Sequence, residues 1–469
     1  MSSTQQSYSI APPASCVLNL TMVYSRTVTT QYGLVRGIVK DGCEEYLGIP
    51  FAAPPVGDLA FKHPVPPESW QGIKDVVRGP YSPVQGKGRS TIEADSKDCL
   101  YLNVFVPEGL PDNAPVMVWF YGGSYANGGC GRIGEDNDKL FYDLAKFAVG
   151  TKTIVVSFNY RLNLEGFLNL NFLNKKFDKS NGLYDQMAAL KFIRNNIHRF
   201  GGDADNVTVF GQSAGSACII ALLGMPEAET LFDKAILQSP CAESFWTEKE
   251  SERLTYKYLN FIGVKPDELA ALKDIGIESI HMANSDLKKL VFREGNARCA
   301  FSPVIDGEVI RGRPVDLAKA SKKPIIIGTC SQEGDAFICN IPTVALPLAA
   351  HWFKFKFHPG KNSRRIMSDN FTSTFYKIPS HEIAREIKGP SWVYEYQYMT
   401  PDIEKRGAGC FHASELPVMF GKSSPYANVD DPVSQRVGEK IREFWSAFAY
   451  TGEAPWNQFK ADGEIMPIK

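Results

Sequence analysis

The most constraining feature of this chain is the pentapeptide Gly211-Gln212-Ser213-Ala214-Gly215. The β-branched and aromatic run at 207–210 predicts a strand before it, and the apolar run at 216–223 predicts a buried helix after it. A strand, Gly-x-Ser-x-Gly and a helix in this order are typical of a nucleophile elbow, a tight turn that exposes a serine hydroxyl. The alternative is an ordinary glycine turn that holds a serine, which the pentapeptide alone leaves open. The flanking strand and helix favour the elbow, with Ser213 as the nucleophile.

Composition and charge narrow the classes of function. Hydrophobic residues make up 44% and charged residues 22% of the 469 positions, as in ordinary soluble globular proteins. A formal net charge of −1 provides no field that would attract nucleic acid or an anionic membrane, and no apolar run is long enough to span a bilayer. The ten cysteines show neither a disulfide framework nor metal-ligand spacing, so no metal site is expected.

Residues 1–26 are expected to form a leader of unknown role. They lack the basic flank and the continuous apolar run of a signal peptide. Together with the scattered cysteines, this predicts a cytoplasmic protein, and secretion is the less favoured alternative. The oligomeric state is left open by the sequence.

Alternating strands and helices predict the fold class. Residues 27–49 alternate in polarity and turn at Asp41-Gly42, which predicts an antiparallel start. Further strands are predicted at 100–106, 116–120, 153–158, 207–210, 235–238, 324–327 and 391–396, with helical stretches such as 183–200 between them. This order predicts one α/β domain over 27–469, a large and mostly parallel central sheet flanked by helices. The stretches 242–320 and 334–390 are expected to be helical insertions that shape a pocket at the active-site end.

A serine nucleophile needs a base, and the base needs an acid to orient it. Five histidines follow the serine: His281, His351, His358, His381 and His412. His412 is the favoured base because it lies in a glycine-rich loop between a predicted strand and an apolar stretch. Glu333 is the favoured acid because it follows the buried strand at 324–327, although Asp335 and Asp306 are competing candidates.

The negative charge that develops on an ester oxygen needs backbone donors. One expected donor is the N–H group of Ala214, directly after the nucleophile. The others are expected from Gly123 and Ser124, in the loop that follows the strand at 116–120. Glycine in that loop lets the backbone approach the substrate closely.

These motifs resemble the type-B carboxylesterase family, the cholinesterase-like branch of the α/β-hydrolases. Further segments carry the resemblance: Asp98-Cys99-Leu100-Tyr101-Leu102-Asn103-Val104, Asn181-Gly182-Leu183-Tyr184-Asp185-Gln186, Phe200-Gly201-Gly202-Asp203 and Ala235-Ile236-Leu237-Gln238-Ser239. The resemblance implies an α/β-hydrolase fold with its triad on Ser213, Glu333 and His412. It also implies an oxyanion hole on Gly123, Ser124 and Ala214.

The sequence therefore predicts a serine carboxylic-ester hydrolase that acts on small to medium esters through an acyl-enzyme intermediate. No metal or organic cofactor is expected. The residues expected to line the substrate pocket are Gln212, Trp246, Phe301 and Phe411. Core packing explains the aromatic ones equally well. Small residues near Ala297 and Cys299 predict a roomy acyl side.

The chain departs from the pattern of the family that it resembles. Cys99 lacks its usual disulfide partner, and Ala60 and Lys97 stand where an arginine and a glutamate often pair. No tryptophan lies between Ser82 and Asp98, which disfavours a quaternary-ammonium substrate. A catalytically inactive adhesion protein is a second hypothesis, disfavoured because all three triad positions are chemically competent. A lipase is a third, disfavoured because 334–390 is mixed in charge.

Overall fold

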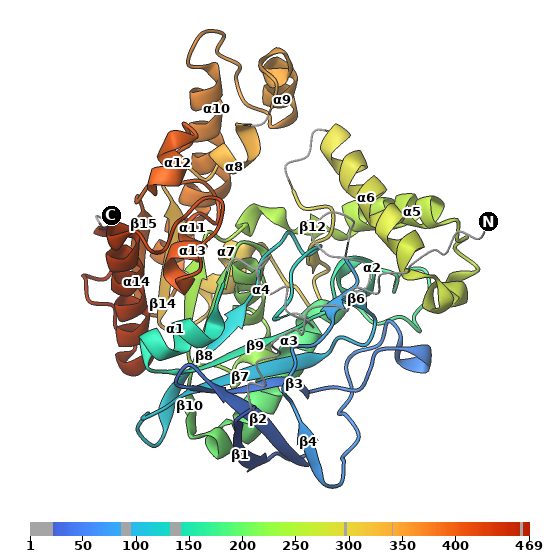
Figure 1. Ribbon diagram of the computed structural model, residues 1–469. Helices are drawn as coiled ribbons and strands as arrows, with labels where there is room; N and C mark the ends of the chain where they lie inside the picture. The colour runs from blue at the N-terminus through green and yellow to red at the C-terminus, as the bar shows by residue number, and fades with distance from the viewer. Residues whose placement is uncertain (1–21, 86–94, 132–141, 295–297, 340, 460–462) are drawn as a thin grey trace, which may run out of the picture.

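The computed structural model of this chain describes residues 22–85, 95–131, 142–294, 298–339, 341–459 and 463–469 (Figure 1). Most of the predicted leader, residues 1–21, lies outside the described residues. The last residues of the predicted leader belong to the sheet, because the first strand, β1 (Tyr24–Thr29), already begins at Tyr24.

One large sheet forms the centre of the part that the structure describes. Its twelve strands lie in the order β1-β2-β3-β7-β9-β8-β10-β11-β14-β15-β16, with β4 paired to β2. Their bounds are β2 (Leu34–Lys40), β3 (Cys43–Pro50), β4 (Ile73–Asp75), β7 (Tyr101–Pro107), β8 (Ala114–Phe120), β9 (Ile154–Phe158), β10 (Gly202–Gln212), β11 (Lys234–Gln238), β14 (Ile325–Cys330), β15 (Ser391–Tyr396) and β16 (Ile465–Ile468). Short strands form two small sheets, β5 (Ser82–Pro83) with β6 (Asp95–Ser96) and β12 (Trp246–Thr247) with β13 (Val304–Ile305).

The pairing of neighbouring strands changes from antiparallel to parallel once along this order. β1, β2, β3, β7 and β9 pair antiparallel in that order. From β9 through β8 to β16 every pair is parallel. Parallel strands are covered on both faces, and β8, β9 and β11 are accordingly buried at every position. The predicted antiparallel start and mostly parallel sheet are confirmed.

Two groups of helices flank this sheet. The first group is α1 (Leu144–Thr151), α13 (Glu415–Phe420) and α14 (Pro432–Thr451), in which α14 contacts β8 and β10. The second group is α3 (Asn181–Asn196), α4 (Ala214–Leu223), α7 (Pro314–Lys319) and α11 (Ile378–Glu386), in which α4 contacts β8, β10 and β11. The predicted α/β-hydrolase architecture, a central sheet flanked by helices, is confirmed.

The remaining helices shape one end of the molecule. α5 (Glu248–Ile262) packs against α6 (Ile277–Arg293), and α8 (Asp335–Ile338), α9 (Leu346–Trp352) and α10 (Ser363–Thr372) form a projection at the top of Figure 1. The shorter α2 (Asn163–Phe167) and α12 (Pro401–Lys405) connect larger elements. The inserted parts are shorter than the predicted stretches 242–320 and 334–390, because the last helix of each, α7 and α11, packs in the layer over the sheet.

Candidate active site

Ser213 occupies the tight turn between β10 and α4. β10 ends at Gln212 and α4 begins at Ala214, which leaves Ser213 with φ 58° and ψ −124°. A non-glycine residue in this sparsely populated region is strained, and such strain concentrates where the surrounding structure fixes a functional group. The predicted elbow therefore has its expected geometry.

Glycines allow the elbow to pack directly on the end of β8. A Cβ atom on Gly215 would overlap the carbonyl oxygen of Phe120 and lie 2.6 Å from that of Tyr121. A Cβ atom on Gly122 would lie 3.0 Å from the Cβ atom of Ser213. Both positions lack room for any side chain, so the two backbones approach as closely as glycine permits.

Gly215→Ala is expected to destabilise the protein by about 3 kcal/mol, the upper end for overpacking, because the methyl group meets rigid backbone. The midpoint of urea-induced unfolding measures this change. Gly276→Ala is the matched control, because a Cβ atom there meets nothing within 4 Å. Equal midpoints for the two variants would contradict the packing argument.

His412 and Glu333 form a tight pair beside the elbow. Glu333 follows β14, and His412 lies in the loop before α13. His412 Nδ1 lies 2.6 Å from Glu333 Oε2, and the Cys330 N–H group donates to Glu333 Oε1 at 2.7 Å. The Glu333 side chain is fully buried, and each of its two carboxylate oxygens is held by one of these hydrogen bonds.

The pKa of His412 is raised above its usual value. Burial of the ring has the largest influence and opposes this rise, because low-dielectric surroundings disfavour the imidazolium. The negative charge of Glu333 and its hydrogen bond to the ring together outweigh the effect of burial. The site thus favours a proton on this histidine.

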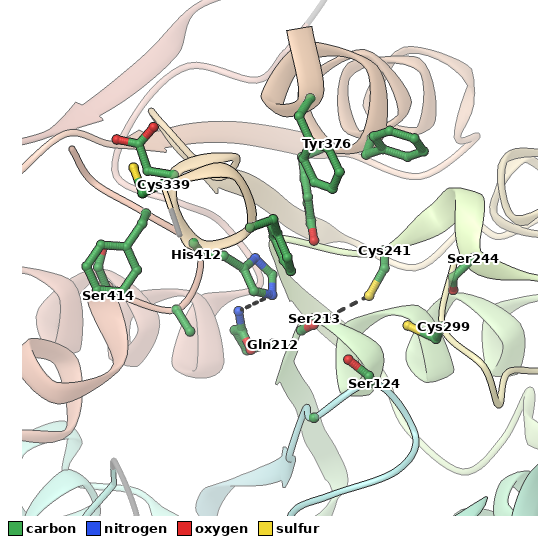
Figure 2. A pocket seen from close by; sticks show the side chains of 18 of the residues that line it. Ser124, Gln212, Ser213, Cys241, Ser244, Cys299, Cys339, Tyr376, His412 and Ser414 are labelled. Carbon is green, nitrogen blue, oxygen red and sulfur yellow. Dashed lines mark hydrogen bonds between the residues drawn. The ribbon is translucent and has the colours of Figure 1, made fainter. Parts of the chain in front are cut away.

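The other ring nitrogen opens onto a cavity. A carboxylate only accepts hydrogen bonds, so Glu333 assigns the proton of neutral His412 to Nδ1 and leaves Nε2 with a lone pair. Gln212 Nε2 lies 3.2 Å from His412 Nε2 and donates to it in this tautomer (Figure 2). The Ser213 hydroxyl lies 3.4 Å from the Cys241 thiol. In this conformation the serine hydroxyl is turned toward Cys241, and the amide of Gln212 occupies the histidine lone pair.

Three backbone N–H groups near the elbow have no hydrogen-bond acceptor among the described residues. They belong to Gly123, Ser124 and Ala214. Gly123 has φ 116° and Ser124 has φ 58°, so the backbone of this loop is irregular. The Tyr160 hydroxyl donates to the carbonyl of Tyr121 at 2.7 Å and holds the start of this loop from behind.

The cavity in front of Ser213 and His412 has a volume of about 690 Å³. One wall is aromatic and carries Phe337, Phe371, Phe375 and Tyr376, from α8, α10 and the π-helical segment Ser373–Lys377 that follows α10. The opposite wall has small polar side chains and thiols, with Ser124, Cys241, Ser244 and Cys299 (Figure 2). A concave site that combines an aromatic wall with a polar one suits a small organic ligand.

The pocket residues expected from the sequence fall into two sets. Gln212 and Phe411 line the cavity. Trp246 and Phe301 do not, because they are buried behind its wall. The Trp246 indole donates to the carbonyl of Cys299 at 2.9 Å, and Phe301 packs edge to face on Tyr258. Ala297 lies outside the described residues.

The competing acids and bases have other partners. Asp335 Oδ2 lies 3.2 Å from Arg365 Nη1, and Asp306 Oδ2 lies 3.2 Å from Lys179 Nζ. His281 Nε2 lies 3.0 Å from Asp95 Oδ2 in a buried pair. His351 and His358 are exposed, and the ring of His381 lies 5.6 Å from that of Phe459, centroid to centroid. The aromatic wall was not predicted, although the spacing of Phe371 and Phe375 on one helical face could have indicated it.

The departures noted in the sequence have structural counterparts. Cys99 is a buried free thiol, and the other eight described cysteines are also free. Lys97 Nζ donates to the carbonyl oxygens of Lys273 and Ile275, at 2.9 and 3.0 Å. In the part of the chain that the structure describes, no helix is both long and apolar enough to cross a membrane.

Comparison with known proteins gives consistent matches. The model of the carboxylesterase family matches residues 24–356. Para-nitrobenzyl esterase of Bacillus subtilis is 34% identical over 91% of this chain and 90% of its own length. Fumonisin B1 esterase of Sphingopyxis macrogoltabida is 31% identical, over 93% of this chain and 85% of its own. A solved structure of a PNB esterase superposes with a TM-score of 0.81 at 32% identity, covering 94% of this chain and 96% of that one.

Proposed function

This chain belongs to the carboxylesterase family and is a carboxylic ester hydrolase, and we propose that it works through a triad of Ser213, His412 and Glu333. The observation that carries the proposal is the His412–Glu333 pair at 2.6 Å, in which the second ring nitrogen, Nε2, faces the same cavity as the Ser213 hydroxyl. A nucleophile, a base and an acid that orients the base are the groups that acyl transfer needs.

The proposed reaction has two halves. His412 Nε2 takes the proton of Ser213 as its oxygen attacks the ester carbonyl, and the N–H groups of Gly123, Ser124 and Ala214 stabilise the oxyanion. The imidazolium then protonates the leaving alcohol, which leaves an acyl group on Ser213. A water molecule that His412 deprotonates attacks this acyl group, and the acid is released as the serine is restored.

One conformational step precedes the chemistry. The Ser213 hydroxyl now contacts Cys241, and the Gln212 amide donates to the nitrogen that must act as the base. The hydroxyl therefore turns toward His412 and displaces the amide before the proton moves. Hydrogen bonds between catalytic groups are often incomplete until substrate is bound, so this arrangement is compatible with the proposed roles.

The walls of the cavity orient the substrate. The leaving alcohol must lie near His412, whose ring has Tyr376 and Phe337 at centroid distances of 5.0 and 5.4 Å. The acyl group then lies toward Cys241 and Cys299. One relative is named for a para-nitrobenzyl ester, and an aromatic alcohol of this kind suits the aromatic wall.

A panel of esters that varies the acyl and alcohol parts independently tests this proposal. We expect aromatic alcohols to be preferred over alkyl alcohols of equal size, and butyryl and hexanoyl groups to be accepted as well as acetyl. A fluorophosphonate should label the intact protein at Ser213 alone. No hydrolysis of any ester, together with no labelling, would contradict the triad.

The pH dependence of kcat/KM is expected to follow His412. Because the base must be neutral to accept the serine proton, and because its pKa is raised, activity should increase with pH through an inflection above about 6.5, the ordinary imidazole value. Initial rates at low substrate concentration from pH 5 to 9 measure this. An inflection below 6 would show that burial outweighs the charge of Glu333.

A further inference from the structure

Two thiols stand together on the acyl side of the cavity. Cys241 belongs to the loop after β11, and Cys299 belongs to the loop after α6. Both line the cavity, and Figure 2 shows their sulfur atoms turned toward one another beside Ser213. The mechanism proposed above uses neither of them.

These thiols contact the proposed catalytic groups directly. Cys241 Sγ lies 3.4 Å from Ser213 Oγ, so one thiol touches the nucleophile. The Cys241 and Ser124 side chains both interact with the Cys299 thiol and lower its pKa. The second thiol thus interacts with a residue of the proposed oxyanion hole. Any change in the bonding of this pair alters the surroundings of Ser213.

The two sulfur atoms differ in acidity. The pKa of Cys299 is lowered, mainly by its interaction with the Cys241 thiol. Together with Ser124 and the nearby His412, this interaction outweighs the opposite effect of burial. The pKa of Cys241 is raised, first by the same interaction and then by burial. Two neighbouring thiols of unequal acidity can act as an attacking and a resolving cysteine.

Other described cysteines lack these properties. Burial raises the pKa of Cys43 and Cys218 to about 12 and that of Cys410 to about 11, so these thiols stay protonated and unreactive. Cys339 is exposed and also lines the cavity, but partial burial raises its pKa. Cys339 therefore provides an internal comparison for the pair.

We propose that Cys241 and Cys299 form a redox-active dithiol, and that peroxide converts it to a disulfide that stops ester hydrolysis. The Cys299 thiolate attacks one peroxide oxygen, the O–O bond breaks, and a sulfenic acid forms as hydroxide leaves. The Cys241 sulfur then attacks the sulfenic sulfur and forms the S–S bond. The S–O bond breaks, and the hydroxyl group of the sulfenic acid takes up the proton of the Cys241 thiol and leaves as water. In total, two thiols and one hydrogen peroxide give one disulfide and two waters.

The disulfide would act on the two contacts that the thiols now make. Its S–S bond is about 2.0 Å long, so forming it brings the two sulfur atoms to bonding distance. Both residues lie in loops, where the backbone can follow such a movement. The bond would draw Cys241 from Ser213 and Cys299 from Ser124, and it would bridge the wall against which the acyl group rests.

The test treats the intact protein with hydrogen peroxide. We expect at least a tenfold loss of esterase activity, a mass decrease of 2 Da, a cross-linked Cys241–Cys299 peptide, and recovery with dithiothreitol. Cys299→Ser and Cys241→Ser, each compared with its own untreated rate, should resist inactivation. Cys339→Ser is the matched control from the same cavity and should remain as sensitive as the unmodified protein.

The chemical arm of this test is independent of the esterase activity, which rests on the proposed function. A protein without esterase activity that still forms the cross-link would contradict the triad and support the dithiol. Phenylarsine oxide, which bridges two neighbouring thiols, should bind the unmodified protein at one equivalent and block the cross-link. Equal inactivation of Cys299→Ser by peroxide, or no Cys241–Cys299 peptide after treatment, would overturn the proposal.

Discussion

Replacing Ser213 with alanine is expected to lower kcat for a para-nitrophenyl ester by about 10⁴-fold or more. The alanine keeps the backbone of the elbow and the oxyanion donors but removes the only oxygen that attacks the carbonyl in the proposed mechanism. Residual hydrolysis would then come from water held against the same donors and base. Steady-state rates of the purified variant, with a parallel fluorophosphonate labelling, measure the effect.

Ser216→Ala is the matched control for this variant. Ser216 lies in α4, on the same helix that follows the elbow, and its buried hydroxyl has no hydrogen-bond partner among the described residues. The same chemical change there removes no interaction, so kcat should stay within about twofold and stability within about 0.5 kcal/mol. Turnover by Ser213→Ala close to that of Ser216→Ala would rule out Ser213 as the nucleophile.

The parts of the fold that sequence could predict are those with a local signature. The parallel strands are short apolar runs bounded by helices, and the elbow needs glycine where Gly215 meets the end of β8. The ends of the inserted segments carry no such signature. Whether a short helix such as α7 or α11 covers the sheet or belongs to the pocket depends on packing with distant strands.

The candidate site could likewise be predicted only where its residues carry a local sequence signature. Chain order and the strand at β14 indicated Glu333, but Asp335 lies only two residues further on, at the start of α8, and only the structure shows which carboxylate faces His412. Trp246 and Phe301 were predicted to line the pocket but lie in the core. The sequence cannot separate the two cases, because an aromatic side chain in a core and one on a cavity wall have the same local pattern.

Contacts between loops lie beyond any local pattern. The sequence indicates Cys299 only as a small residue on the acyl side, and no local pattern pairs it with Cys241. Their pairing arises because the loops after β11 and α6 converge on Ser213. The aromatic wall has the same origin, because it forms only when α8 and α10 pack together.

Glu333→Gln is expected to lower kcat by about 10⁴-fold while the fold is kept. The Cys330 N–H group donates to Glu333 Oε1, so in the variant the amide oxygen occupies that position and the NH₂ group faces His412 Nδ1. An amide that donates to Nδ1 forces the ring proton onto Nε2. The lone pair that should accept the Ser213 proton is then lost, although every atom stays close to its place.

Glu415→Gln provides a control with the same chemical change in the same buried region. Burial, with the charge of Glu333, raises the pKa of Glu415 to about 7, so below pH 7 its carboxyl group is largely protonated and already resembles an amide. Its contacts are with the Cys330 thiol at 3.1 Å and the Gln238 amide at 3.4 Å, and it does not touch His412 through a hydrogen bond. We expect kcat at pH 6.5 to fall less than about tenfold in this variant.

The pH profile separates an orienting role of Glu333 from simple damage to the site. Loss of its negative charge removes the main influence that raises the pKa of His412, so the residual activity of Glu333→Gln should inflect at lower pH than the unmodified protein. Glu333→Asp keeps the charge, and it should recover part of kcat and return the inflection toward its original position. If Glu333→Gln and Glu415→Gln lose activity equally with unchanged inflections, Glu333 does not orient His412, and the carboxylate of the triad must be sought elsewhere.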